Sequence, residues 1–222
     1  MLVRFCAPGN AWDGQVANGT RKSTETRQRI LDAAAKAFRR KGYVATRLAE
    51  IASLAGMRAG SIYYHFDSKE QILEEVLEIG IRRISEAVSE ALAALPERAS
   101  HRARIGAAAT AHMTTLLRHG DYSSANMRNF SQIPAPVRRR HLKTRRQYEA
   151  TWRSLLAEAQ AAGELSSTAD PKLLRLFLLG AINWSMEWYR PKGESIEGIA
   201  AAFTTFLFEG AGAQPARQRR AG

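Results

Sequence analysis

The sequence predicts an all-α protein with nine helices, divided into a small N-terminal domain and a larger C-terminal one. Apolar residues recur at helical spacing along the chain, and no run of alternating apolar and polar residues indicates a strand. The predicted helices end where helix breakers stand, at Pro96, Gly120, Pro134, Gly163 and Pro191.

Three short helices are predicted in the first third of the chain. The first carries one apolar stripe and ends in basic residues before Gly42, which favours a left-handed cap. Thr46 can cap the second helix, and Gly56 makes a turn before the third. The predicted ranges are 24–41, 47–55 and 59–65. Two short helices joined by a glycine turn are typical of a helix-turn-helix.

A long helix is predicted to follow, over residues 69–95. Asp67 with Glu70, and Ser68 with Gln71, both have capping-box spacing at its start. The five remaining helices are predicted at 100–118, 123–132, 136–162, 170–189 and 195–209. The predicted domains are a flexible leader (1–22), the helix-turn-helix domain (23–68), a larger helical domain (69–210) and a basic tail (211–222).

The chain is strongly basic. Its 222 residues include 33 Lys+Arg and 21 Asp+Glu, a formal net charge of +12. A balance of this kind indicates a polyanionic partner such as nucleic acid, an anionic membrane surface or a phosphate-bearing ligand. The charge is clustered: residues 21–50 hold nine basic and three acidic residues, and residues 138–146 hold six basic residues and no acid.

Several other classes of site are not expected. Cys6 is the single cysteine, so neither an intrachain disulfide nor a thiolate metal site is possible. The five histidines are too scattered to predict a metal site, and no cofactor motif is present. The N-terminus lacks the apolar stretch of a signal peptide, and no segment is long and apolar enough to span a membrane. We therefore expect a cytoplasmic protein without metal, cofactor or membrane partner.

The stretch "ATRLAEIASLAGMRAGSIYYHFDSKEQIL" resembles the N-terminal domain of the TetR family of bacterial transcriptional regulators. The resemblance covers residues 26–72. It rests on Ile30, Ala33, Phe38, Gly42, Thr46, Ile51, Ala52, Ala55, Gly56, Gly60, Tyr63, His65, Phe66, Lys69 and Leu73. It implies a nine-helix fold, a dimer, and a repressor that leaves a near-palindromic DNA operator when a small molecule binds.

Two positions depart from the commonest pattern of that family. Arg58 stands where a small hydroxyl residue is frequent, and Ala59 where a basic or polar residue is frequent. Without the hydroxyl, the third helix lacks an obvious side-chain cap, which costs about 1 kcal/mol. Arg58 can instead reach a phosphate or a guanine edge. The operator sequence therefore cannot be transferred from relatives.

The third helix is predicted to contact DNA. Gly60 and Ser61 are short enough for the backbone to approach a duplex closely. Tyr63 and Tyr64 lie on adjacent sides of the helix, so we expect Tyr63 to contact a phosphate and Tyr64 a base edge or a second phosphate. The side chains expected to point into the domain core instead are Ile62 and Phe66.

Two helix starts are predicted to bind further phosphates. Lys69 stands in the first turn of the long helix, and Thr46 stands at the start of the second helix. Helix N-termini favour anions. The predicted DNA-binding set is Thr46, Arg58, Ala59, Gly60, Ser61, Tyr63, Tyr64 and Lys69.

The last two helices are predicted to form a homodimer. The helix over 170–189 is apolar nearly all round, so it needs cover on two sides. One side can face its own core, and the other needs a partner or a ligand. The last two helices, meeting the same helices of a second copy, would make a four-helix interface. We expect a charge at Phe203, or at whichever of Leu176 and Leu179 faces outward, to break the dimer.

A ligand pocket is predicted among aromatic and apolar residues of the larger domain, although such residues at helical spacing also occur as plain core. The candidates are Met113, Leu117, Phe130, Tyr148, Trp152, Phe177, Asn183 and Trp184. The segment "NWSMEWYRPKGESIEGIA" is similar to a TetR branch that controls fatty-acid or steroid-ring catabolism and responds to coenzyme A thioesters. That similarity implies a thioester inducer, with some of Arg139, Arg140, Arg145 and Arg146 at the pocket mouth. A solvated helix face is the alternative for those arginines.

Two other functions were weighed against the ligand-responsive repressor. A constitutive architectural DNA-binding protein would need no pocket, and it remains open on the sequence. An enzyme acting on coenzyme A thioesters would need a nucleophile with its base, a phosphate-binding glycine loop or a metal site. The sequence contains none of these patterns, so we expect no enzyme.

Overall fold

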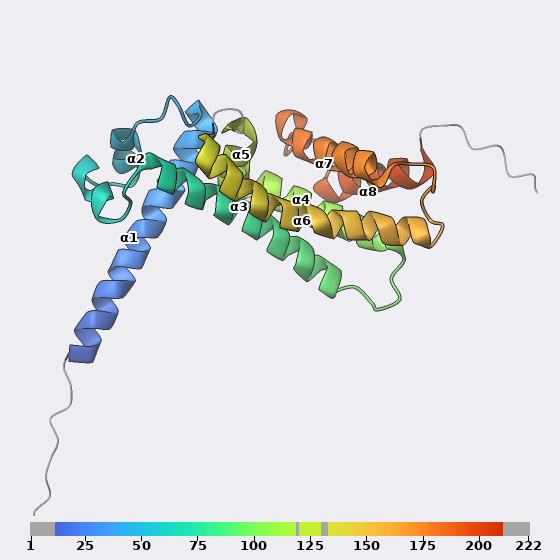
Figure 1. The fold of residues 1–222 in the computed structure, drawn as a ribbon, viewed down its shortest axis with the longest axis horizontal. Helices are drawn as coiled ribbons and strands as arrows, with labels where there is room; N and C mark the ends of the chain where they lie inside the picture. Colours follow the sequence, from blue (N-terminus) through green and yellow to red (C-terminus); the bar gives the residue numbers. More distant parts are fainter. Residues whose placement is uncertain (1–11, 119, 130–132, 211–222) are drawn as a thin grey trace, which may run out of the picture.

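The computed structural model describes the backbone of residues 12–118, 120–129 and 133–210. Within those residues every regular element is helical, and the helices form an elongated molecule (Figure 1). The elements are α1 (Trp12–Lys41), α2 (Leu48–Leu54), the 3₁₀ helix η1 (Ala59–Tyr64), α3 (Lys69–Ala93), α4 (His101–Arg118), α5 (Gly120–Asn129), α6 (Ala135–Ala161), α7 (Pro171–Trp188) and α8 (Ile196–Glu209). The predicted all-α fold is confirmed for the described residues.

Some boundaries differ from the prediction. The first helix begins at Trp12, so residues 12–22 of the predicted leader are helical. No proline interrupts that stretch, and a glycine inside a helix costs only about 1 kcal/mol. The third helix is a six-residue 3₁₀ helix without a side-chain cap, and 3₁₀ geometry is common in short pieces. The rest of the leader (1–11) and the predicted tail (211–222) lie outside the described residues.

Several predicted helix ends are confirmed. Gly42 has φ of 82°, the left-handed conformation expected after α1. The Ser68 hydroxyl accepts a hydrogen bond from Gln71 N at 3.2 Å at the start of α3. The predicted N-cap of α2, Thr46, is wrong. Arg47 is the N-cap residue of α2, and it makes no side-chain hydrogen bond there.

Two apolar cores are arranged along the molecule. The first core joins α1, α2, η1 and the first half of α3 to Tyr122 and Ala125 of α5 and Val137 of α6. The second core joins α3 from Ile81 onward to α4, α6, α7 and α8. Helix α3 therefore belongs to both cores and connects the N-terminal domain to the larger one.

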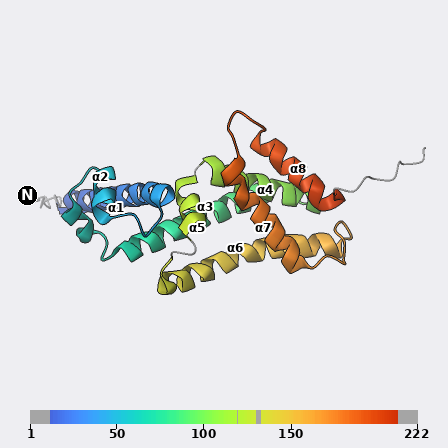
Figure 2. The ribbon, with the colours of Figure 1, turned by 90° about the horizontal axis from the view of Figure 1, so that it is seen from above.

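The junction between the two cores is closely packed. A Cβ atom added at Gly80 of α3 would lie 2.8 Å from the carbonyl oxygen of Tyr122 in α5. The Tyr122 hydroxyl donates to Asp32 of α1 at 2.6 Å, so α5 is tied to the N-terminal domain. In the larger domain, α7 and α8 pack on α4, and α7 also packs on α6 (Figure 2).

Candidate DNA-binding surface and ligand cavity

The 3₁₀ helix η1 presents one face to the core and another to solvent. Ile62 and Phe66 are each 1% exposed, whereas Tyr63 is 61% and Tyr64 is 89% exposed. The inward pair is as predicted, and the two tyrosines lie on the outer surface. No atom lies within 4 Å of a Cβ added at Gly60. The backbone at Gly60 is thus open to close approach by another molecule.

Two arginines of α1 hold the helix-turn-helix in place. Arg27 donates through one guanidinium nitrogen to the carbonyl of His65 and through the other to Glu75 of α3. Its guanidinium also lies 4.0 Å above the centre of the Phe66 ring. Arg29 donates to the carbonyl of Ala55. Part of the positive charge of α1 therefore fixes the helix-turn-helix and is not available to a partner.

Two predicted phosphate contacts are corrected by the structure. Thr46 is only 1% exposed, and its hydroxyl donates to the carbonyl of Gly42 at 2.8 Å. The Lys69 ammonium donates to the carbonyls of Tyr43 and Thr46, both at 2.8 Å, and lies 4.2 Å from the Tyr43 ring centre. Burial lowers the pKa of Lys69, and the neighbouring Glu70 opposes that shift. The Thr46 hydroxyl closes the loop after α1 on itself, and Lys69 holds that loop against the start of α3.

The exposed residues around η1 are the remaining candidates for contact with DNA. Arg58, Ala59 and Gly60 are exposed, and Ser61 is half-buried at the start of the helix. Arg47, at the start of α2, is also exposed. The sequence prediction missed Arg47, because it assigned the cap of α2 to Thr46. The basic character of the flanking positions would have been the signal for it.

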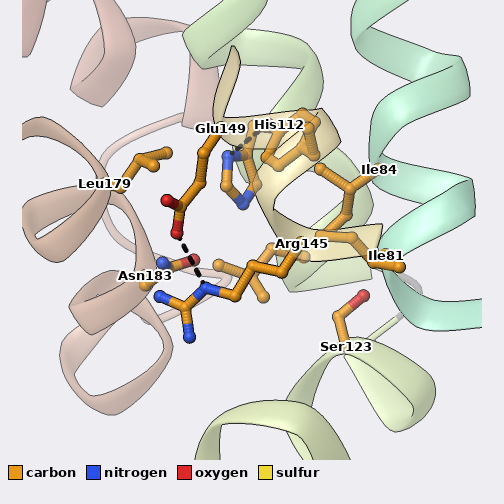
Figure 3. A pocket seen from close by; sticks show the side chains of 10 residues that line it. Ile81, Ile84, His112, Ser123, Arg145, Glu149, Leu179 and Asn183 are labelled. Atoms are coloured by element: carbon orange, nitrogen blue, oxygen red, sulfur yellow. Dashed lines mark hydrogen bonds and ion pairs between the residues drawn. The ribbon is translucent and has the colours of Figure 1, made fainter. Parts of the chain in front are cut away.

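A partly open cavity of about 270 Å³ lies in the larger domain and is lined by residues of α3, α4, α5, α6 and α7 (Figure 3). Two predicted ligand residues, Tyr148 and Asn183, line it. The complete lining is Ile81, Ile84, His112, Leu116, Ser123, Arg145, Tyr148, Glu149, Leu179 and Asn183. The walls are apolar on the α3 side and polar where α6 faces α7.

His112 is the most deeply buried polar residue of the cavity. Its Nδ1 lies 2.9 Å from the Tyr148 hydroxyl, while its Nε2 is buried without a hydrogen bond partner. Burial lowers the pKa of His112 to about 4, and the Asn183 side chain partly opposes that shift. The imidazole is therefore neutral at pH 7. The sequence prediction missed His112 as a ligand residue, because histidines were considered there only as metal ligands.

An ionic network borders the same cavity. Glu149 accepts from Arg145 at 2.9 Å and pairs with Arg175 at 2.6 Å. Arg145 belongs to the basic run of α6 and lines the cavity. Arg140 of the same run pairs with Glu74 of α3. The run has no acid in sequence, but the fold brings acidic partners to it.

Other predicted ligand residues lie elsewhere. Met113 and Trp152 are fully buried core residues, and Leu117 lines a separate cavity of about 230 Å³ beside α7. Phe177 and Trp184 are 71% and 64% exposed, on the face of α7 away from the cavity. Phe130 lies outside the described residues. The prediction of Phe177 and Trp184 as cavity residues is wrong, because the apolar periodicity of α7 does not reveal which face is inside.

The outer surface of α7 and α8 carries large exposed apolar side chains. Its large apolar residues, all 47% or more exposed, are Leu173, Leu176, Phe177, Trp184 and Trp188 of α7 and Phe206 of α8. Leu179 is buried and Phe203 is half-buried, so Leu176 is the outward member of the predicted pair. Several large apolar side chains exposed in this way indicate an interaction surface.

The described residues contain no cluster of three metal-ligating side chains. No helix among them has both the length and the apolar character needed to cross a membrane.

Comparison with known families agrees with both ends of the molecule. Residues 30–76 match the family described as "Bacterial regulatory proteins, tetR family", and residues 98–211 match "Tetracyclin repressor-like, C-terminal domain". The chain belongs to the TetR family. The family consists of regulatory proteins, so the prediction of a DNA-binding transcriptional regulator that is not an enzyme is confirmed.

Relatives within the TetR family align along most of the chain. The HTH-type transcriptional repressor KstR2 of Rhodococcus jostii (strain RHA1) is 27% identical over 201 residues, 87% of this chain and 95% of KstR2. The fatty acid metabolism regulator protein of Bacillus subtilis (strain 168) is 23% identical over 154 residues, 69% of this chain and 78% of that protein. These relatives agree with the resemblance seen in the C-terminal segment.

A solved TetR-like structure has the same fold. AibR, crystallised with isovaleryl coenzyme A and operator DNA, superposes with a TM-score of 0.73 at 22% identity, covering 82% of this chain and 98% of AibR. This similarity confirms the fold alone.

Proposed function

We propose that this TetR-family regulator is a repressor that binds a near-palindromic operator as a dimer and is released by a small molecule. One observation carries the proposal: a single helix, α3, begins a few residues after η1 and also supplies Ile81 and Ile84 to the wall of the cavity. A ligand that displaces α3 would move η1 with it. A constitutive architectural protein would need neither the cavity nor this connection.

Side-chain contacts strengthen the connection through α3. Arg140 of α6, a helix that lines the cavity, pairs with Glu74 of α3. At the next position, Glu75 accepts from Arg27, which also holds the carbonyl of His65 after η1. Helix α6 carries Arg145 and Tyr148 of the cavity as well. A shift of α6 against α3 would therefore reach the DNA-binding surface through contacts that exist in this structure.

The apolar face of α7 and α8 supports a dimer. Two copies joined through this face would bury Leu176, Phe177 and Trp184, which are otherwise exposed. Helix-turn-helix dimers bind half-sites about 34–36 Å apart, so both η1 segments must be held at a fixed spacing. Exchanging Phe177 for glutamate would place charges in that contact. We expect light scattering to report a monomer and operator affinity to fall by at least about tenfold; a dimer that persists would place the interface elsewhere.

The inducer is proposed to be an acyl or polycyclic coenzyme A thioester. The cavity, at about 270 Å³, is near the lower limit of about 300–1,000 Å³ for small-molecule sites, which suits an acyl group rather than the whole cofactor. AibR, whose fold is the same, was crystallised with isovaleryl coenzyme A. Arg145 at the cavity and the exposed Arg139 and Arg146 of α6 offer guanidinium groups to phosphates.

The proposal is tested by operator release in a DNA-binding assay. An acyl coenzyme A, its free acid and free coenzyme A are compared at equal concentrations, across chain lengths and ring systems. We expect release by a thioester and weaker release by the other two. Release by the free acid alone would remove the role given to the arginines. Absence of release by every compound would contradict a thioester inducer, while operator binding itself would still stand.

The proposed partner is operator DNA, so we expect the protein to act in the cytoplasm.

Base selection is tested at η1 itself. Replacing Tyr64 or Arg58 with alanine should change the preferred operator sequence, because both side chains are exposed beside the open backbone of Gly60. Selection from a random DNA library by each variant measures that preference. Arg21→Ala, in the exposed ion pair with Glu25 of α1, is the control and should leave the preference unchanged.

A further inference from the structure

The cavity contains a polar atom that the protein itself does not satisfy. His112 Nε2 is buried and faces the cavity, and no described residue meets it with normal hydrogen-bond geometry, although the Asn183 side chain lies near enough to oppose the fall in the His112 pKa. An unpaired polar atom in such a place is costly, and native proteins rarely keep one without a use. The inference below rests on the proposed function, because it concerns the ligand of the same cavity.

The hydrogen bond on the other side of the ring determines what Nε2 can do. The Tyr148 hydroxyl, 2.9 Å from Nδ1, is the one partner that the described residues give this nitrogen. Burial raises the pKa of Tyr148, so the hydroxyl keeps its proton. A neutral phenol is a good donor, and a neutral imidazole offers one acceptor nitrogen and one N–H. When Tyr148 donates to Nδ1, the ring hydrogen resides on Nε2 and points into the cavity, and this is the tautomer that the proposal below requires.

We propose that the buried end of the ligand carries an uncharged carbonyl oxygen on an apolar frame, and that His112 Nε2–H donates a hydrogen bond to this oxygen. Ile81, Ile84 and Leu179 form the apolar wall against which the frame packs. Asn183 lies beside the imidazole and offers an amide to the same polar end of the ligand (Figure 3). A ring ketone and a thioester carbonyl both meet this description.

The charges around the cavity favour an uncharged group. Glu149 is already held by Arg145 and Arg175, so a ligand carboxylate would have to compete with it for the guanidinium groups. A ligand ammonium would face the same two arginines. A charged ligand group beside the neutral, buried imidazole would also lose its hydration shell. That loss costs free energy when no opposite charge lies at contact distance. A carbonyl oxygen needs only the donor that His112 supplies.

The test uses three matched probes and the full-length protein without DNA. They are trans-decalin, trans-1-decalone and a trans-decalin carboxylate, which share the apolar frame and differ in the polar group. Binding is measured by titration calorimetry. We expect the ketone to bind at least about tenfold more tightly than the hydrocarbon, because it pairs a buried donor that the hydrocarbon leaves unpaired. The carboxylate should bind more weakly than the ketone.

Two histidine variants separate the proposed contact from general packing. His112→Phe keeps a ring of similar shape but removes the donor, so the ratio of ketone to hydrocarbon affinity should fall to about one. His141→Phe replaces another buried histidine, which lies on α6 and does not line the cavity. In that control the ratio should stay at its original value.

Nitrogen NMR on the unaltered protein gives a second measurement if His112→Phe does not fold. Labelled imidazole nitrogens should show a buried neutral histidine with its hydrogen on Nε2. Adding decalone should shift that Nε2 resonance, and adding decalin should not. The proposal is overturned by a hydrogen on Nδ1, by equal affinities of ketone and hydrocarbon, by tighter binding of the carboxylate, or by no binding of either neutral probe. Because DNA is absent from these measurements, a failure here is distinct from a failure of operator binding.

Discussion

The first and second cores differ in how completely their buried polar atoms are paired. Among the described side chains of residues 21–93, no buried nitrogen or oxygen lacks a hydrogen bond partner. In the second core, His112 Nε2 and Trp152 Nε1 make no hydrogen bond of normal geometry, and a cavity adjoins the histidine. The first core is complete as a single polypeptide. The second core has donors and space that its own side chains do not use, as a domain built to admit a ligand would.

The largest expected contrast between the cores is in their acid sensitivity. The unfolded chain protonates His112 below pH about 6.5, whereas the folded protein does so only near pH 4. The free energy of unfolding should therefore fall as pH drops through this window, by about 3 kcal/mol in total for a shift of this size. Burial also lowers the pKa of His141, which adds to the loss. Urea denaturation at several pH values measures the slope.

The first core should contribute to acid sensitivity at lower pH. The hydrogen bond from Tyr43 lowers the pKa of Glu70 from 4.5, so its stabilisation is present above pH 4.5 and is lost below it. His112→Phe should flatten the slope between pH 6.5 and 4 and leave the acidic limb in place. An identical slope in the variant and the original protein would show that His112 does not carry this effect.

The next effect concerns the pairing in the first core. Arg27→Met keeps much of the side-chain length but leaves Glu75 and the carbonyl of His65 without their donor. We expect a loss of about 2 kcal/mol, allowing for the partial exposure of the pair. Thermal or urea denaturation checks it. The matched control is Arg21→Met, in the exposed ion pair with Glu25, where a change above about 0.5 kcal/mol would be unexpected.

A smaller effect is expected at the junction of the two cores. In Gly80→Ala the new Cβ would lie 2.8 Å from the backbone oxygen of Tyr122, so α3 and α5 must separate slightly. We expect a loss of about 1 kcal/mol and a weaker coupling between ligand and DNA. Gly106→Ala is the control, because its Cβ would make only an ordinary contact with Thr204 at 3.5 Å. Equal stabilities of the two variants would contradict the close packing at Gly80.

The smallest effect should come from removing the polar pair of the second core. In His112→Phe with Tyr148→Phe, the 2.9 Å hydrogen bond and the unpaired Nε2 disappear together. Replacing both partners by apolar rings of similar shape is often nearly neutral or stabilising. We expect a change in the free energy of unfolding at pH 7 within about 0.5 kcal/mol of zero. A loss of several kcal/mol would mean that this pair supports the fold rather than the ligand.

The sequence was sufficient for features that depend on nearby residues. Tyr63 and Tyr64 outward and Ile62 inward follow from the spacing within one short helix, and Gly42 and Ser68 act at helix ends as their types predict. The same reasoning failed for Lys69. Its partners are the carbonyls of Tyr43 and Thr46, more than twenty residues earlier, and no local pattern shows that the loop returns to the start of α3.

In the larger domain, the limit was the choice between two apolar faces. Helix α7 is apolar nearly all round, so its pattern predicts cover on both sides without indicating which side is the core. Ile182 and Leu178 point inward, while Phe177 and Trp184 point outward. His112 was missed for a related reason: only the packing of α4 against α6 shows that its ring is buried beside Tyr148.

Because α3 is long, a small rotation about its cavity end displaces its other end by a larger distance. Ile81 lies 12 residues from Lys69, a span of about 18 Å at about 1.5 Å per residue. A rotation of the helix by about 6° around its cavity end would carry the other end through about 2 Å, because a rigid helix converts angle into travel. Travel of that size exceeds the tolerance of hydrogen bonds to phosphates and bases, whose useful lengths span about 0.5 Å. Under the proposed function, a ligand far smaller than the domain would therefore disengage the DNA-binding surface by widening the cavity slightly.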